Sequence, residues 1–410
     1  MASDAMRVAE KTGDWRTALV LLETMCDQRI PDQVSYHRCM SACGAAGLWA
    51  LAVHLLATMC CWQLVPEVIS YNRCISACRK AAKGLEAVRL LEQIFEKQLE
   101  ADVISFNTAI SACERSGLWS EALELLKRIA DDRELVPDVI SYSSVISACD
   151  KGEQWLMALS VLSSMEDAAV RPNAISFNSA ISACAKVGQW LQALELLKRM
   201  EFTDVISYSG SISACERGRQ WEMALVLLRS AHCEPDVICY SSAISACEKN
   251  GQWQQALQIL QQMKRMRRVP NVISYSSAIS ACEKGGQWLQ ALQLFHVMSA
   301  AKLEVDRICF NSLIAACESQ WSLALELFTM LGQPNLISYN GAMGACQSCG
   351  EWFQTLQLFQ ELRKSDLSPD VISFEIVLRA CEDGRQEIFL LRCLDDARRS
   401  WQVTGRSLRS

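Results

Sequence analysis

The fold is decided by one segment, which reads VISYSSAISACEKGGQWLQAL from Val272 to Leu292. Versions of this segment recur along nearly the whole chain, and one cysteine marks each copy. Neighbouring copies are 35 or 36 residues apart, except at three places where the spacing falls to between 29 and 32. A repeat of this length predicts an array in which each repeat packs only on its neighbours. The marking cysteines are Cys43, Cys78, Cys113, Cys149, Cys184, Cys215, Cys247, Cys282, Cys317, Cys346 and Cys381.

Each copy contains two stretches with the apolar spacing of an α-helix. In the first stretch, Tyr275, Ala278 and Cys282 recur at intervals of three and four residues, which places them on one helix face. Gly285 interrupts this stretch, and a second helical pattern begins near Trp288. Each repeat is therefore predicted to be a helix–turn–helix hairpin that must stack on its neighbours to bury its apolar face.

Ten of the twelve tryptophans stand at the start of the second helical stretch. Such a stripe has two interpretations, a platform on which nucleic-acid bases stack or a wedge that packs between adjacent hairpins. The regular spacing beside small residues such as Ala281 favours packing. The tryptophans are Trp15, Trp49, Trp119, Trp155, Trp190, Trp221, Trp253, Trp288, Trp321 and Trp352.

The repeat frame divides the chain into ten complete repeats between two incomplete ends. Residues 1–32 are expected to hold half a repeat, residues 371–397 an incomplete C-terminal repeat, and residues 398–410 a basic tail. Counted from the residue after each Pro-Asp or Pro-Asn, the complete repeats are 33–67, 68–102, 103–138, 139–173, 174–204, 205–236, 237–271, 272–306, 307–335 and 336–370.

Three of the complete repeats are shorter than the others. Those that begin at Ala174 and Val205 are expected to lose residues after the second helix. The repeat that begins at Arg307 is expected to lose part of the turn between its helices.

Composition limits the classes of protein that fit. Half of the residues are hydrophobic and 21% are charged, which suffices for a continuous core. The net charge of −6 excludes a uniformly basic nucleic-acid binder, so any anion-binding surface must be local. Equivalent cysteines in neighbouring helical repeats should lie roughly 8–10 Å apart, too far for a disulfide. Free cysteines in this number fit a reducing compartment.

Hairpins of this length, with Tyr-Asn or Tyr-Ser early in the first helix, resemble the pentatricopeptide repeat family in its P-type array. The sequence motif Ile-Ser-Ala-Cys-Glu-Lys resembles the version of the repeat that is expanded in dinoflagellate algae. The tetratricopeptide pattern does not fit, because its tryptophan lies in the first helix. The resemblance covers nearly the whole chain. It implies an all-α, right-handed superhelical solenoid of helix–turn–helix hairpins that binds single-stranded RNA at about one nucleotide per repeat.

The resemblance implies that the fifth and the last residue of each repeat read one base. Asn and Ser offer a donor and an acceptor whereas Asp only accepts, so such pairs can distinguish Watson–Crick edges. The fifth residues are His37, Asn72, Asn107, Ser143, Asn178, Ser209, Ser241, Ser276, Asn311 and Asn340. The last residues are Glu67, Asp102, Asp138, Asn173, Asp204, Asp236, Asn271, Asp306, Asn335 and Asp370.

The resemblance also implies a base-sandwiching residue at the second position and a phosphate-facing basic residue near the end of the first helix. A β-branched side chain with a stiff rotamer suits a sandwich. The second residues are Val34, Ile69, Ile104, Ile140, Ile175, Ile206, Ile238, Ile273, Ile308 and Ile337. The basic residues are Lys80, Arg115, Lys151, Lys186, Arg217, Lys249 and Lys284.

Helix stability offers an alternative for both polar sets. Asp or Asn before a helix is a favoured N-cap, and a cation after a helix end suits the macrodipole. Yet Ser and Thr, which also cap well, never occupy the last position, and the fifth position is mostly Asn or Ser. These restrictions favour base reading, while both interpretations of the basic residues stay open.

Under the code of the family, Asn with Asp favours U, Ser with Asn favours A, Ser with Asp favours G, and Asn with Asn favours C or U. The repeats from Val68 to Asp370 then spell U-U-A-U-G-A-G-C/U-U from 5′ to 3′. His37 with Glu67 lies outside the code. A shortened repeat that changes the helix spacing would skip a base.

The sequence favours an RNA-binding adaptor over an enzyme. The four histidines fit no metal or triad pattern, and Cys346 with Cys349 is a weak zinc or redox motif. No metal, other cofactor or membrane span of ~18 apolar residues is expected. The alternatives are a protein-interaction solenoid and, third, an enzyme acting through these two cysteines.

The resemblance adds expectations about partners and place. The protein is expected to be monomeric and to bind a processing enzyme or another protein besides RNA. The family works in chloroplasts or mitochondria, and of these two organelles we expect the chloroplast to be the location of this protein. Repeat material begins by Trp15, so no targeting peptide is expected in this chain.

Overall fold

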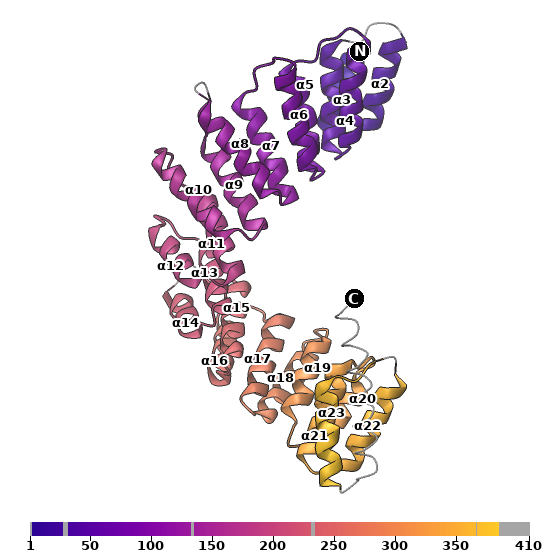
Figure 1. Ribbon diagram of the computed structural model, residues 1–410, viewed down its shortest axis with the longest axis vertical. Helices are drawn as coiled ribbons and strands as arrows, with labels where there is room; N and C mark the ends of the chain where they lie inside the picture. Colours follow the sequence, from indigo (N-terminus) through magenta and orange to yellow (C-terminus); the bar gives the residue numbers. More distant parts are fainter. Residues whose placement is uncertain (1, 28–31, 133–134, 231–233, 366, 385–410) are drawn as a thin grey trace, which may run out of the picture. The chain divides into compact units, whose positions relative to one another are not determined.

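The computed structural model of the chain describes residues 2–27, 32–132, 135–230, 234–365 and 367–384. Over these residues the chain forms 23 α-helices and no β-strand. Odd-numbered helices are the first and even-numbered helices the second of each hairpin, which confirms the predicted all-α hairpin array (Figure 1). The chain divides into two compact units, Met1–Gly218 and Arg219–Ser410.

The helices have nearly uniform lengths and follow the repeat frame. The first helices are α1 (Ala2–Thr12), α3 (Gln33–Ala45), α5 (Val68–Lys80), α7 (Val103–Ser116), α9 (Val139–Lys151), α11 (Ala174–Val187), α13 (Val205–Arg217), α15 (Val237–Lys249), α17 (Val272–Lys284), α19 (Arg307–Ala316), α21 (Leu336–Ser348) and α23 (Val371–Asp383). The second helices are α2 (Trp15–Asp27), α4 (Trp49–Cys61), α6 (Gly84–Glu96), α8 (Trp119–Asp131), α10 (Trp155–Asp167), α12 (Trp190–Arg199), α14 (Trp221–Ser230), α16 (Trp253–Arg265), α18 (Trp288–Ala300), α20 (Trp321–Met330) and α22 (Trp352–Lys364).

A polar N-cap fixes where the first helices begin. Asp138 has an extended backbone, and its Oδ1 accepts the backbone N–H of Ser141 at 2.8 Å. A bond of this kind satisfies an orphan helix donor and stabilises the helix by roughly 1 kcal/mol. Glu67 lies before α5 and makes no such bond with its longer side chain. The capping residues are Asp32, Asp102, Asp138, Asn173, Asp204, Asp236, Asn271, Asp306, Asn335 and Asp370.

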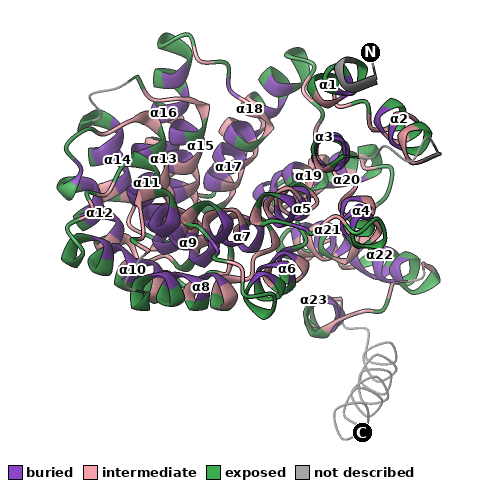
Figure 2. Cartoon of the chain, turned by 90° about the horizontal axis from the view of Figure 1, so that it is seen from above, coloured by how far each residue is buried: buried purple, intermediate pink, exposed green. Residues whose placement is uncertain are grey.

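The core lies between the two layers of helices. Within the first unit α3 packs on α5, and α4 packs on both, so the hairpins stack in sequence order. All eleven repeat cysteines are at most 1% exposed, which suits a small apolar side chain where helices approach closely. Figure 2 shows the buried residues on the helix faces that meet neighbouring helices.

The tryptophans pack on the next repeat. A Cβ built on Gly152 would lie 2.4 Å from Cδ1 of Trp119, and one built on Gly285 would lie 2.2 Å from Cδ1 of Trp253. At these two places the indole covers the turn of the following hairpin so closely that an added Cβ would clash with it. This contact supports the packing interpretation over a base-stacking platform.

Three expectations about repeat boundaries need correction. Residues 1–32 contain a hairpin rather than half a repeat, because α1 packs on α2 and α3, with Met6 fully buried and Ala9 nearly so. In the repeat at 307–335, α19 and α20 have ten residues each, so both helices are short and the turn is retained. α12 and α14 also have ten residues, so these two repeats are shortened within the second helix itself, and not only after it as the sequence suggested.

Replacement of Gly285 by Ala should destabilise the array by roughly 1–3 kcal/mol, the usual effect of overpacking. Its backbone angles are ordinary (φ −86°), so the loss would come from the contact with Trp253 alone. Chemical unfolding of the variant measures the change. Gly332→Ala is the matched control, because a Cβ there meets no atom within 4 Å. Equal stability of the two variants would contradict the proposed indole contact.

Candidate nucleic-acid interface

The second residue of every repeat is held out toward solvent. These ten side chains, nine Ile and one Val, are between 50% and 67% exposed. The residues that follow them turn inward: Ser274 is fully buried and Tyr275 is 3% exposed. An apolar side chain exposed at the same place in every first helix is available to contact a ligand, as a base sandwich requires.

The structure joins the fifth and the last residue in five of the ten repeats. In each case the fifth residue is Asn, and its side-chain amide donates to the last residue. The two residues stand at the N-terminal ends of successive first helices. The Nδ2-to-Oδ distances are 3.3 Å for Asn72 to Asp102, 3.1 Å for Asn107 to Asp138, 3.3 Å for Asn178 to Asp204, 3.5 Å for Asn311 to Asn335 and 3.1 Å for Asn340 to Asp370.

Capping and ligand contact do not exclude one another at the last position. Asp138 uses Oδ1 for the cap on Ser141 and for the bond from Asn107, and among the described residues its Oδ2 has no partner. Asn173 also caps through Oδ1, which leaves its Nδ2 free to donate. Asp thus offers an acceptor and Asn a donor, although both cap equally.

The fifth-position serines behave differently from the asparagines. Each donates its hydroxyl to the carbonyl of its own helix three residues earlier, and in the described residues no hydrogen bond joins Ser143 to Asn173, Ser241 to Asn271 or Ser276 to Asp306. Two of these serines are buried, with Ser143 8% and Ser241 7% exposed. The bonds are Ser143 to Ile140 (3.2 Å), Ser209 to Ile206 (2.9 Å), Ser241 to Ile238 (3.0 Å) and Ser276 to Ile273 (3.1 Å).

The first complete repeat does not form a reading pair. His37 is only 9% exposed, and its Nε2 lies 2.7 Å from Oγ of Ser70. Burial, helped by the charge of Arg73, lowers the pKa of His37 from its ordinary 6.5, so this side chain is neutral at pH 7. Glu67 is exposed and joined to His37 by no hydrogen bond in the described structure.

One cavity of about 500 Å³ brings the predicted classes together. The exposed Ile69 and Ile104 of consecutive first helices line it, and the pair Asn72 and Asp102 lies with them. Lys80 also reaches this cavity. Sandwich, reading and basic residues of a single repeat therefore line one space.

The basic residues are less free than the sequence suggested. Lys80 and Arg115 are exposed and have no carboxylate partner in the described residues, and Arg217 donates to the carbonyl of Lys186 at 2.7 Å. Three others are paired with an acid of the preceding repeat, one residue before the equivalent basic position. These ion pairs join Lys151 to Glu114 (3.0 Å), Lys186 to Asp150 (3.2 Å) and Lys284 to Glu248 (2.8 Å).

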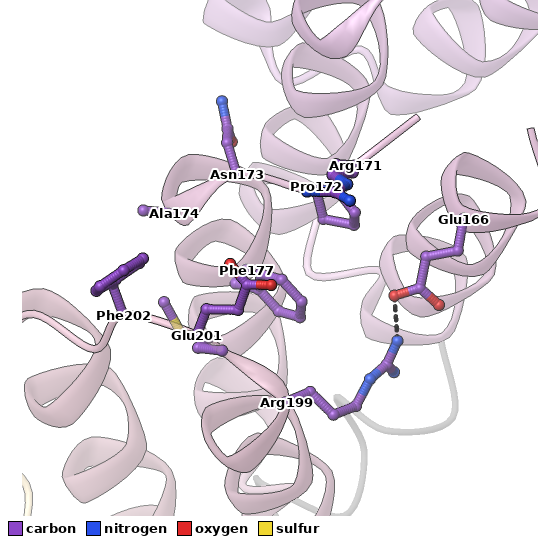
Figure 3. A pocket seen from close by; sticks show the side chains of 10 residues that line it. Glu166, Arg171, Pro172, Asn173, Ala174, Phe177, Arg199, Glu201 and Phe202 are labelled. Atoms are coloured by element: carbon purple, nitrogen blue, oxygen red, sulfur yellow. Dashed lines mark hydrogen bonds and ion pairs between the residues drawn. The ribbon is translucent and has the colours of Figure 1, made fainter. Parts of the chain in front are cut away.

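A second cavity, of about 430 Å³, lies where α12 ends early. Arg199 is ion-paired with Glu166 on one side of it, and Phe202 lies on the other (Figure 3). Phe202 is 85% exposed, and Asn173, the last residue of its repeat, is also in the lining. The sequence did not single out Phe202, because it stands outside the repeat pattern.

The alternative site at the Cys-x-x-Cys motif has little geometric support. Cys346 is fully buried in the core, whereas Cys349 is exposed with its thiol 3.5 Å from the carbonyl of Glu318. The described residues contain no group of three or more His, Cys, Asp or Glu side chains placed to hold a metal. Among their helices, none is long and apolar enough to cross a membrane.

These features define an α-helical repeat protein whose first helices present rows of paired polar side chains beside exposed isoleucines. The sequence model of the PPR repeat family matches residues 137–186 and 235–284, and that of the single PPR repeat matches residues 69–99, 104–133, 175–202 and 273–303. The chain belongs to the pentatricopeptide repeat family.

Two curated relatives are pentatricopeptide repeat-containing proteins of Arabidopsis thaliana. One, a chloroplastic protein, is 34% identical over 62 residues, which are 15% of this chain and 7% of the relative. The other, described as putative, is 39% identical over 59 residues, 14% of this chain and 7% of the relative. The matched segments thus span a small part of both relatives.

Two solved structures share the fold. The pentatricopeptide repeat protein PPR10 in complex with an 18-nucleotide psaJ RNA element has a TM-score of 0.75 and 18% identity, over 96% of this chain and 59% of that chain. PPR10 from maize has a TM-score of 0.59 and 22% identity, over 96% of this chain and 63% of that chain. This chain therefore spans about three fifths of the PPR10 length.

The pKa values of four last-position carboxyl groups lie below the ordinary value for Asp. Partial burial acts to raise the pKa of Asp138, but hydrogen bonds from Ser141 and Asn107 outweigh it and hold the pKa below the ordinary 3.8. The pKa values of three others are lowered in the same way, those of Asp102, Asp204 and Asp370.

Removal of the amide in Asn107→Ala should raise the pKa of Asp138 toward 3.8. The folded state favours the carboxylate, so its contribution to stability is present above pH 3.8 and is lost as the pH falls through the lower folded value. Carbon NMR titration of the Asp138 carboxyl measures its pKa in the wild-type protein and in the variant. Thr108→Ala is the control, because the Thr108 hydroxyl bonds only to Ile104 of its own helix. An unchanged pKa in Asn107→Ala would mean that the amide does not bind the carboxylate.

Proposed function

We propose that this protein binds single-stranded RNA in a sequence-specific manner, at about one nucleotide per repeat. The observation that carries the proposal is the set of five Asn side chains bonded to the last residue of their repeat, each beside exposed isoleucines. The PPR10 structure with an RNA element adds support through its shared fold.

Each base would lie between the second-position side chains of consecutive repeats. In the cavity between Ile69 and Ile104, the pair Asn72 and Asp102 faces the space that such a base would fill. Asn then offers its second amide hydrogen, and Asp its second carboxylate oxygen, to the Watson–Crick edge. A donor beside an acceptor suits the O4 and N3–H groups of uracil.

The serine repeats would read purines by the same logic. A Ser hydroxyl that donates its proton to its own helix can only accept from a ligand, so Ser beside an Asp carboxylate offers acceptors, which suits the N–H donors of guanine. Beside Asn it meets an amide donor as well, which suits adenine. Nine repeats would then select U-U-A-U-G-A-G-C/U-U.

The role we infer is that of an adaptor without catalysis of its own. By gripping a strand of nine or ten nucleotides it would stabilise a transcript, remodel it, or bring a processing enzyme to it. The chloroplastic relative supports an organelle, with the chloroplast favoured over the mitochondrion. A monomer suffices for this role.

The decisive experiment compares the affinity of the protein for the predicted RNA and for a scrambled RNA of equal composition, over a range of salt concentrations. The predicted RNA should bind at least tenfold more tightly, and both affinities should fall as salt rises. Equal affinities would refute base reading. Negligible RNA binding would favour the alternative, a solenoid that binds proteins.

Asn107→Ser should change the preference of one repeat from U toward G. The substitution removes the amide bonded to Asp138 and creates the Ser–Asp combination of Ser276 and Asp306. We expect a change of about tenfold in the ratio of U to G affinities at that base, equivalent to one or two hydrogen bonds. Binding to four RNAs that differ only there measures it. Thr108→Ser, at the next position, should leave the ratio unchanged.

Glu114→Gln should strengthen RNA binding about threefold, because it releases Lys151 to contact phosphate. The slope of log affinity against log salt should steepen by about 0.7, the value for one added phosphate contact on a single strand. Glu124→Gln removes the same charge from the ion pair with Arg128 on α8 and serves as the control. Identical slopes in the two variants would show that Lys151 faces no phosphate.

A further inference from the structure

A serine hydroxyl of the following repeat contacts the fifth-position Asn in three places. This serine is the third residue of its repeat, one turn into the next first helix. In each case the serine lies closer to the Asn carbonyl oxygen than to the capping side chain. The Oγ-to-Oδ1 distances are 2.6 Å for Ser141 to Asn107, 2.7 Å for Ser338 to Asn311 and 2.7 Å for Ser373 to Asn340.

The contact decides which way the Asn amide faces. Asp138 accepts from Nδ2 of Asn107 at 3.1 Å, and Ser141 approaches Oδ1 of the same amide. A flipped amide would point its oxygen at a carboxylate and its NH₂ at a hydroxyl that already accepts the backbone N–H of Asp138 at 3.1 Å. The serine proton therefore fixes the orientation in which one amide hydrogen remains for a ligand.

The sequence shows the same dependence between the two positions. Each of the five fifth-position asparagines is followed by Ser at the third position of the next repeat. Cys occupies the third position twice, at Cys239 and Cys309, and both follow a repeat with Ser at the fifth position. A thiol is a weak donor, so it stands only where no amide needs to be oriented.

Two of the five asparagines lack this contact. The carbonyl oxygens of Asn72 and Asn178 are buried and have no hydrogen-bond partner among the described residues. The hydroxyls of Ser105 and Ser207 are instead directed at the capping carboxylates, each at 2.6 Å.

We propose that the third-position hydroxyl is a specificity-determining positioning residue for the base read by the preceding repeat. It holds the fifth-position amide in the orientation that selects pyrimidines, and it is dispensable where the fifth residue is Ser. This inference rests on the proposed function, which it deepens. Recognition of one base would therefore depend on three residues from two repeats.

The test compares three variants with the wild-type protein. Ser141→Cys removes the strong donor at a site that follows Asn, and Ser141→Thr retains a hydroxyl. Ser274→Cys is the matched control, because Ser274 follows Ser241 and its hydroxyl bonds only to the capping Asn271 (2.8 Å). Thermal unfolding checks that all three remain folded.

Two measurements are made on each protein. RNA binding gives two ratios of affinities. One compares U with the other bases opposite the repeat at 103–138, and the other compares A with the other bases opposite the repeat at 237–271. Hydrogen exchange of the Asn107 side-chain amide, followed by NMR without RNA, reports its bonding directly. Loss of one neutral hydrogen bond should change either quantity about five- to tenfold.

Ser141→Cys should lose discrimination by this factor and exchange its amide faster, Ser141→Thr should restore both, and Ser274→Cys should alter neither. If wild-type protein discriminates U and Ser141→Cys does so equally, the positioning role is wrong while base reading stands. If the wild-type protein discriminates no base, the proposed function fails. Unchanged exchange of the Asn107 side-chain amide in Ser141→Cys would overturn the positioning role whatever the RNA result.

Discussion

The bond between a capping carboxylate or amide and the third backbone N–H of the next helix organises this protein. It sets where each first helix begins, as at Asp138 and Ser141. It also holds the last residue of one repeat beside the fifth residue of the same repeat, because the cap stands at the end of the neighbouring helix. The rows of exposed isoleucines and paired polar groups both follow from that start point.

Under the proposed function, a single side chain serves both the helix cap and the RNA ligand. The cap needs one acceptor oxygen, whereas Asp and Asn each carry a second polar atom that remains for recognition. The hairpin packing works on the other side of the helix, where the buried cysteines and the indoles over glycine turns keep successive repeats at one spacing. Packing sets the distance between neighbouring pairs of polar side chains, and capping sets which polar atoms each pair presents.

Much of this arrangement could be predicted from the sequence because it repeats. The tryptophans that begin the second helices, the buried cysteines and the exposed second-position residues all recur at regular spacing in the sequence. The ion pair between Lys151 and Glu114 was missed. An acid stands directly before the basic residue in both of these repeats, as Glu114 does before Arg115, but a single sequence does not show that it pairs with the basic residue of the next repeat. The hairpin at the N-terminus was also missed, because α1 has neither the marking cysteine nor the tyrosine.

The shortened repeats carry a consequence for how such an array changes over time. α12 and α20 have lost about one helical turn, yet Asn178 and Asn311 still reach their partners. Helix length therefore varies, in α19 as well as in the second helices, while the bond between the fifth and the last residue is kept. Exchange of Asp for Asn at a cap, which preserves the helix start, would likewise alter the target with little loss of stability. Under the proposed function, mutations can therefore change the RNA target while the helical array stays folded.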